Sequence, residues 1–231
     1  MPSIITVMLP SAFQYKDDAY VRNVGDALAY PFQHAFLNCW TTSYVPASTT
    51  SLGIPDNKCN EVTIVSFDLT MYTHLETLVV GKNCYRNVEV FNITGLDSLR
   101  SIVINDYSFY SASFYSMDLP SLETVECGDY TFFDCSHAAF ENLPQLTSMQ
   151  LGESAFVFPQ NSTDSSLIMR NLPALSVLTA VTTGNSFRSP YAITLEGIPS
   201  LNTVTLPSSS FSDAESITVR NISQALSNYL Q

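Results

Sequence analysis

Residue types that could carry out catalysis or bind a metal ion are few and scattered in this sequence. The three histidines are His34, His74 and His137, and none stands at a spacing typical of a metal site. The sequence has neither the Gly-x-Ser-x-Gly motif of serine hydrolases nor the His-Glu-x-x-His motif of zinc proteases. Gly81-Lys82 lacks the flanking residues of a phosphate-binding loop. We therefore expect no enzyme activity, no catalytic residues, no metal site and no cofactor.

Cysteine chemistry offers one specific hypothesis, a disulfide between Cys59 and Cys84. The chain has five cysteines and no Cys-x-x-Cys pair, so a zinc site has no support. Cys59 and Cys84 stand within one residue of the same register in neighbouring sequence units. Stacking of the units would bring their Cα atoms to about 5 Å, within disulfide range. The alternative is a buried pair of reduced thiols, and Cys127 occupies an expected core position.

Three asparagines could carry glycans. Asn92, Asn161 and Asn221 begin Asn-x-Ser/Thr sequons. A chain this rich in Ser and Thr contains such sequons by chance, so they do not by themselves indicate secretion. Residues 1–9 have no basic residue before their apolar stretch and make a poor signal peptide. Localisation is therefore open, and it is cytoplasmic if Met1 is the true start.

Composition narrows the function classes further. The 231-residue chain is 45% apolar and 12% aromatic, which indicates a folded protein. Its formal net charge of −12 has the wrong sign for binding nucleic acid or an anionic membrane surface. No run of 18 apolar residues occurs, so we expect no membrane insertion. The expected partner is a protein or a glycan.

An internal repeat organises most of the chain. Each unit opens with Leu, two residues, an aliphatic residue, one residue and a small or apolar residue, and a Phe or Tyr follows. Successive openings are 24, 23, 24, 29 and 26 residues apart. The openings are Leu75, Leu99, Leu122, Leu146, Leu175 and Leu201. A second apolar pair follows in each unit, for instance Phe91-x-Ile93 and Tyr115-x-Met117.

These periods predict short strands rather than helices. The opening motif ends in an alternation of period two, and the second apolar pair alternates in the same way. One unit cannot bury its apolar side alone, whereas stacked units pair strand on strand and share a core. We expect a mainly β fold, a solenoid whose short parallel strands stack into one sheet. A second strand per repeat is expected on the opposite side.

The repeat resembles the leucine-rich repeat, with its Leu-x-x-Leu-x-Leu-x-x-Asn-x-Leu core. It is most similar to the BspA-like group of protist and bacterial surface proteins, where Phe takes the last core place and Asn-Leu-Pro-x-Leu links the units. Residues 142–146 and 171–175 match that link. The resemblance covers residues 59–231 and implies a right-handed solenoid with an extracellular or cell-surface location. It departs from the family at the asparagine position, which the following residues occupy: Asn83, Tyr107, Tyr130, Ser154, Asn185 and Ser209.

The departure puts the usual asparagine ladder in doubt. The next position carries a hydroxyl or thiol in five of the six units, and these side chains could take over part of its role. They are Cys84, Ser108, Thr131, Ser186 and Ser210.

Two regions are expected along the chain. Residues 1–58 show no clean repeat and are expected to form an irregular N-terminal cap region. Residues 59–231 are expected to form a solenoid of about six repeats, starting near 75, 99, 122, 146, 175 and 201, with a truncated seventh at 226–231. Because solenoids need polar caps and none is visible at this end, end-to-end self-association is a further expectation.

Two sets of outward positions are candidate binding residues. The first lies between the core positions of the opening strand and comprises Glu76, Arg100, Glu123, Glu126 and Gln150. The alternative is that such residues merely suit an exposed sheet. The second set is aromatic. Tyr110 and Phe133 follow the core Phe and should be exposed, whereas Tyr107 and Tyr130 should face the turn interior and pack there.

The function expected from these features is non-catalytic macromolecular recognition. The chain would act as a protein-binding or adhesion module through its repeat surface. The alternative is an intracellular structural or regulatory segment of a larger repeat protein. A carbohydrate-active β-solenoid is disfavoured because no acidic cluster recurs along one strand column.

Overall fold

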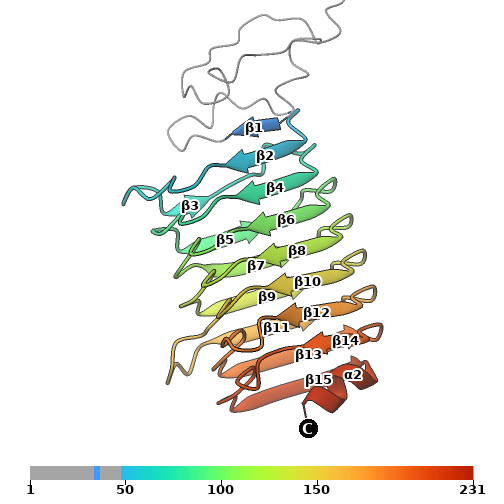
Figure 1. Ribbon diagram of the computed structural model, residues 1–231. Helices are drawn as coiled ribbons and strands as arrows, with labels where there is room; N and C mark the ends of the chain where they lie inside the picture. The colour runs from blue at the N-terminus through green and yellow to red at the C-terminus, as the bar shows by residue number, and fades with distance from the viewer. Residues whose placement is uncertain (1–33, 37–47, 231) are drawn as a thin grey trace, which may run out of the picture.

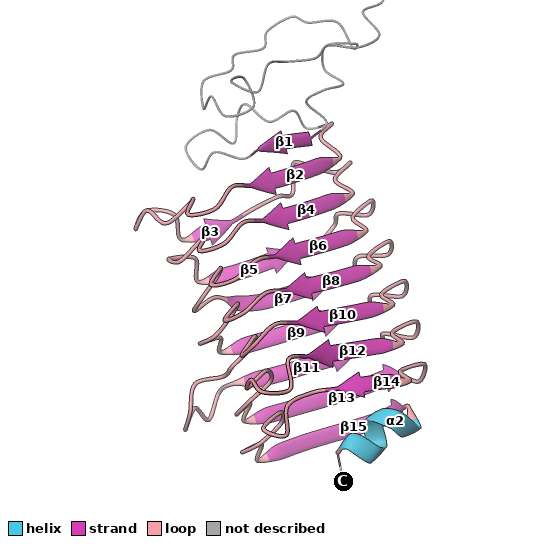
Figure 2. Ribbon diagram, in the orientation of Figure 1, coloured by secondary structure: helices cyan, strands magenta, loops and turns pink. Residues whose placement is uncertain are grey.

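Two parallel β-sheets wind into a solenoid in the computed structural model, which describes residues 34–36 and 48–230 (Figure 1). Each turn of the chain adds one strand to each sheet, and the strands stack in two columns (Figure 2). The fold is mainly β, as the period-two alternation predicts. The second strand per repeat is present and forms a sheet of its own.

Sheet A holds eight strands and sheet B holds seven. Sheet A consists, in spatial order, of β1 (His34–Phe36), β2 (Ser51–Ile54), β4 (Thr77–Val80), β6 (Ser101–Ile104), β8 (Thr124–Cys127), β10 (Ser148–Leu151), β12 (Val177–Ala180) and β14 (Thr203–Thr205). Sheet B consists, in chain order, of β3 (Ser66–Phe67), β5 (Val90–Ile93), β7 (Ser113–Met117), β9 (His137–Glu141), β11 (Ser166–Arg170), β13 (Ala192–Ile198) and β15 (Ser216–Ile222).

The core lies between the two sheets and is built from repeated columns of side chains. In sheet A the inward positions pair directly across strands, as Leu78 pairs with Ile102 and Met149 with Leu178. The aromatic residue of each turn stacks on that of the next, with ring centroids 4.8 to 5.9 Å apart. This buried stack comprises Tyr85, Phe109, Phe132, Phe156, Phe187 and Phe211. The core positions predicted from the repeat are confirmed for this stack.

The register of β7 differs from the predicted one by one residue. Phe114 and Ser116 point into the core, and Tyr115 and Met117, the expected inward pair, point outward. Phe114 occupies the core position because its ring packs against those of Phe91 and Phe140, with centroids 5.2 and 4.8 Å away. The shift places the Ser116 hydroxyl in the core, where it has no hydrogen-bond partner among the described residues.

The solenoid begins earlier than residue 59, so the predicted boundary at 58/59 is wrong. Strand β2 pairs in register with β4, and β1 pairs with β2. The turn after β2 repeats the later ones, with Cys59 in the place of the core aromatic. The repeat was hidden because this turn has neither the opening Leu nor the Phe. The rest of the predicted cap, residues 1–33 and 37–47, lies outside the described residues.

A short helix, α2 (Gln224–Tyr229), stands where a truncated seventh repeat was expected at 226–231. The Ser223 hydroxyl caps the helix by accepting the N–H of Leu226, whose side chain is buried. The Tyr229 ring packs edge-on against Phe211. The helix contacts β14 and so covers the end of sheet A only. On β15 the core-side residues Ile217 and Val219 remain 51% and 41% exposed.

Candidate binding site

The turns that follow β2, β4, β6, β8 and β10 share one backbone shape over five residues. The third and fifth residues have positive φ, for example 60° at Tyr107 and 51° at Phe109. The fifth residue enters the core and the second is not buried in any of these turns, whereas the third is outward except at Ser154, which is buried. The candidate surface described below includes residues at these outward positions.

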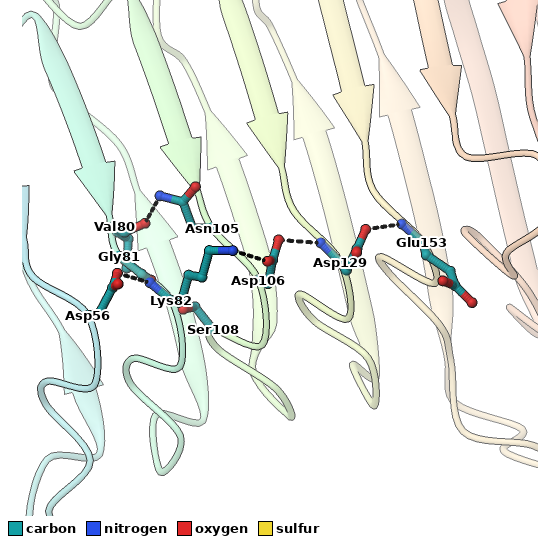
Figure 3. A network of polar contacts seen from close by, with 9 residues as sticks. All are labelled: Asp56, Val80, Gly81, Lys82, Asn105, Asp106, Ser108, Asp129 and Glu153. Carbon is teal, nitrogen blue, oxygen red and sulfur yellow. Dashed lines mark hydrogen bonds and ion pairs between the residues drawn. The ribbon is translucent and has the colours of Figure 1, made fainter.

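A ladder of carboxylates joins the second residues of successive turns (Figure 3). The Asp56 carboxylate accepts the N–H of Lys82 at 2.7 Å. Asp106 accepts the N–H of Asp129 at 3.1 Å, and Asp129 accepts that of Glu153 at 2.7 Å. Each acid therefore satisfies a backbone donor of the following turn, which the strand ladder leaves without a partner.

Glycine at the first turn position makes room for this ladder. A Cβ on Gly128 would lie 2.4 Å from Asp106 Oδ1 and 2.7 Å from its backbone nitrogen. Gly81 and Gly152 follow Asp56 and Asp129 in the same relation, with contacts of 2.5 to 2.7 Å. The glycine is therefore set by the aspartate of the preceding turn.

The one exception among these turns supports the same explanation. Lys82 replaces the acid, and the next turn then begins with Asn105 instead of glycine. Asn105 donates through Nδ2 to the carbonyl of Val80 at 2.8 Å. The Lys82 ammonium reaches forward to Asp106 Oδ2 at 2.7 Å. This ion pair holds the pKa of the Asp106 carboxyl below its ordinary value.

A buried column of hydroxyls and one thiol lies at the fourth turn position. The Ser108 hydroxyl donates to the carbonyl of Gly81 and accepts the N–H of Cys84. Ser186 makes the same two bonds, to Gly152 and from Ala155. The hydrogen bonds to neighbouring backbone that the sequence predicts for this column are present at Ser108 and Ser186.

The expected Cys59–Cys84 disulfide does not form. Cys84 is a free, buried thiol that donates to the carbonyl of Pro55 at 3.1 Å. Cys59 is disulfide-bonded, but not to Cys84. The two stand one residue out of register, because Cys59 occupies the fifth turn position and Cys84 the fourth. Cys127 is buried and free, as expected, and burial raises its pKa to about 12.

An aromatic quartet lies on the surface of two adjacent turns, formed by Tyr107, Tyr110, Tyr130 and Phe133. Tyr107 stacks on Tyr130 at 5.2 Å with an interplanar angle of 5°, and Tyr110 packs against Phe133 at 5.1 Å. Tyr130 and Phe133 join the two pairs at 5.5 Å. Tyr107 is 51% and Tyr110 36% exposed, while the other two are half-buried.

Tyr107 and Tyr130 were expected to pack in the turn interior, and this expectation is wrong. They stand at the third turn position, which in these two turns is not buried, and they stack with each other at the surface. The Tyr130 hydroxyl donates to Glu153 at 3.2 Å, and this bond raises its pKa. Tyr110 and Phe133 are at the surface, as their place after the core Phe predicts. The quartet therefore connects directly to the carboxylate ladder.

The five predicted polar residues are exposed, either on the outer face of sheet A or in the segments that lead into its strands. Arg100 pairs with Glu123 at 2.6 Å, and Glu76 lies on the preceding turn. Glu126 and Gln150 are cross-strand neighbours that help line a shallow hollow at the ends of β6, β8 and β10. The same strands lead into the turns that hold the quartet. Glu126 and Gln150 therefore lie together at a hollow beside the turns, whereas Glu76, Arg100 and Glu123 precede the strands at their other end.

The outer face of sheet B carries polar contacts that the repeat pattern did not single out. Arg170 pairs with Glu141 at 3.0 Å and with Glu196 at 3.3 Å. His137 lies 3.0 Å from the hydroxyl of Ser166, and its other ring nitrogen is 4.0 Å from Asp164. Asp164 is 95% exposed and too distant to orient the ring, so we assign no reaction to this group.

The three sequons lie at exposed positions of the described structure. Asn92 is on the outer face of β5, Asn161 is in the loop before β11, and Asn221 is near the end of β15. A glycosylating enzyme could reach each side chain. The possibility of glycosylation therefore stands as predicted from the sequence.

Comparisons with known proteins give no family to this chain. No family model, no curated protein and no solved structure matches it. Within residues 34–36 and 48–230, no three His, Cys, Asp or Glu side chains are grouped so as to hold a metal ion. In the same part of the chain no helix is long and apolar enough to cross a membrane.

Proposed function

We propose that the protein is a non-catalytic recognition module, a protein-binding or adhesion unit that acts through its repeat surface. The observation that carries this proposal is the aromatic quartet. Four exposed or half-exposed rings lie in mutual contact on two adjacent turns, beside a row of carboxylates. Clustered tyrosines of this kind supply a large contact area at low entropic cost and are typical of binding surfaces.

Rigidity of the turns supports the same function. The carboxylate ladder and the buried hydroxyl column tie each turn to the next through backbone hydrogen bonds. The side chains displayed on these turns are therefore held in place before a partner arrives. Less conformational entropy is lost on binding than from a flexible loop.

The proposal includes a kinship with leucine-rich repeats of the BspA-like group and a right-handed winding. The leucine spacing and the Asn-Leu-Pro-x-Leu links support this kinship. Its asparagine position is an exposed turn residue at Tyr107, which is a departure from the family pattern. A surface location follows from the kinship and is part of the proposal.

The test is binding to arrays of immobilised extracellular proteins and glycans. The variant to compare is Tyr107→Asn/Tyr130→Asn, since asparagine occupies the same turn position at Asn57 and Asn83 and tolerates its positive φ. Tyr115→Ser, on the outer face of sheet B, is the control. We expect ligands that bind the wild type and the control but not the double variant. If every array ligand binds all three proteins equally, the quartet is not a recognition site.

The second candidate function is a structural or regulatory segment within a larger repeat protein. The exposed core-side residues Ile217 and Val219 favour it, because another coil stacked on β15 would bury them. Sedimentation of the wild type and of Ile217→Lys/Val219→Lys distinguishes the two cases. End-on association that the double variant abolishes supports this candidate. A monomer at all concentrations argues against self-assembly through β15.

A further inference from the structure

Charged side chains surround the aromatic quartet unequally. Asp129 lies on the same turn as Tyr130, Glu153 lies on the next turn, and Asp134 follows Phe133. On the opposite side, Lys82 is paired with Asp106, which leaves Arg86 as the unneutralised cation of the preceding turn. Arg86 donates to the side chain of Asn83, the neighbour of Tyr107 in the turn column. The quartet therefore has an acidic side toward Glu153 and a basic side toward Arg86.

The acids on the acidic side retain capacity to accept further hydrogen bonds. Asp129 uses Oδ1 for the N–H of Glu153, and Glu153 uses Oε1 for the Tyr130 hydroxyl. A carboxylate can accept about four hydrogen bonds, so each has an oxygen for a donor from outside. Neither acid is paired with a cation among the described residues. An incoming cation would therefore meet two unneutralised carboxylates next to aromatic rings.

The shape of the quartet restricts what can bind to it. Tyr107 and Tyr130 are parallel and 5.2 Å apart, so each covers one face of the other. The rings consequently offer edges, hydroxyls and outer faces rather than a broad open platform. Such a surface suits a planar group that can stack on the outer face of a ring while it donates hydrogen bonds to a carboxylate. The guanidinium of arginine is planar, stacks on aromatic rings and carries five donors.

We propose that the quartet, with Asp129 and Glu153, binds arginine side chains of a basic, extended protein segment. This inference rests on the proposed recognition function and names its ligand class. Successive turns repeat at the strand spacing of about 4.8 Å, and two residues of an extended peptide span about 6.6 Å. The difference of about 2 Å is within the reach of a long arginine side chain, so two alternate arginines of such a segment can contact neighbouring turns. The net charge of −12 steers a basic partner toward this protein.

The experiment uses a fluorescent Arg-Ser repeat peptide of eight residues, titrated with the full chain at low salt and at 0.3 M salt. The same peptide with citrulline in place of arginine is the matched neutral probe, and cellohexaose tests a glycan ligand. Tyr107→Asn/Tyr130→Asn should weaken peptide binding about tenfold, the size expected for one or two cation–π contacts. Glu153→Gln should also weaken it, because glutamine keeps an acceptor for Tyr130 but removes the charge.

One variant separates this site from general attraction to an acidic protein. Arg86→Ala removes the cation on the basic side. It should strengthen binding of the arginine peptide severalfold, because it removes the repulsion between two positive charges at the surface. Glu215→Gln, an exposed acid far along the chain, removes the same charge as Glu153→Gln and should have no effect. The citrulline peptide should not bind any of these proteins.

Three outcomes would overturn the inference. Equal binding of the arginine peptide to the wild type and to the tyrosine double variant would show nonspecific attraction. Binding of cellohexaose that depends on the quartet, without peptide binding, would assign the site to glycans and leave the recognition function intact. If neither probe binds the wild type, arginine is not the ligand, and the array experiment alone then decides the proposed function.

Discussion

The relation between glycine and the preceding aspartate gives the sharpest prediction about stability. In Gly128→Ala the new Cβ would lie 2.4 Å from Asp106 Oδ1 and 2.7 Å from the Asp106 nitrogen. Either the carboxylate or the turn must move, and the N–H of Asp129 then loses its charged acceptor. A lost hydrogen bond to a charged group costs about 1.5–3 kcal/mol, and displacement of packed backbone costs about 1–3 kcal/mol. We expect the free energy of unfolding to fall by about 3–5 kcal/mol.

Two control variants isolate the steric cause. Gly95→Ala introduces strain from a φ of +68° but meets nothing within 4 Å, so about 1–2 kcal/mol is expected. Asn105→Ala, at the equivalent position one turn earlier, already has a Cβ and should lose only the hydrogen bond to Val80, about 1 kcal/mol. Urea unfolding followed by circular dichroism measures all three. The close-approach explanation fails if Gly128→Ala is no more destabilising than Gly95→Ala.

The reverse exchange tests the same rule in the turn that breaks it. Lys82→Asp restores an acid to the ladder but places it against the Cβ of Asn105. We expect the single variant to be less stable than the double variant Lys82→Asp/Asn105→Gly, which recreates the arrangement at Gly128 and Asp106. A coupling free energy near zero between the two substitutions would refute the reasoning.

Three further predictions concern the core, the thiols and acid stability. Ser116→Ala should raise the free energy of unfolding by about 1 kcal/mol, since it removes a buried hydroxyl that has no hydrogen-bond partner among the described residues. An unchanged midpoint of urea unfolding would favour the register in which residue 116 faces solvent. Cys84, Cys127 and Cys135 are buried, and burial raises the pKa of each thiol. Iodoacetamide at pH 8 should therefore label these thiols only after denaturation, as measured by mass spectrometry. Rapid labelling of the native protein would argue against the fold. The pKa of Asp106 is lowered mainly by the hydrogen bond from Lys82, so ionised Asp106 stabilises the fold above the unfolded-state pKa, and this stabilisation is lost as pH falls through the folded-state pKa. Lys82→Met should therefore flatten the loss of stability between pH 5 and 2, measured by thermal melting. An unchanged profile would assign the acid sensitivity to other carboxyls.

Periodicity predicted much of the fold because the core positions recur at fixed places in every turn. Leu78, Ile102 and Val125 could be aligned without any structure, and they pair across the sheet as the alignment requires. The β7 register was missed because Tyr115 and Met117 are together more apolar than Phe114 and Ser116, the true inward pair. A choice between two alternating patterns depends on what the neighbouring turns offer, and here Phe91 and Phe140 decide it.

The candidate site was predicted only in part, because its geometry depends on contacts between turns. Tyr110 and Phe133 could be placed at the surface from their position after the core Phe. The exposure of Tyr107 depends on the shape of a turn in which it has a φ of 60°, a conformation that no preference of tyrosine would suggest. The disulfide hypothesis failed for a similar reason, since a shift of one residue separates the core place of Cys59 from the hydroxyl column of Cys84.

The turn separates the residues that stabilise it from those that can vary. Its first, second and fourth positions hold the backbone through Gly128, Asp106 and Ser108, and its fifth fills the core. The third position has a positive φ and accepts residues of different size, since asparagine, tyrosine and a buried serine all occupy it. A tyrosine pair can therefore stand at the surface there without loss of the contacts that hold the coil. Stability does not require exposed aromatic rings at this position, and their presence on two adjacent turns is the reason we propose recognition as their role.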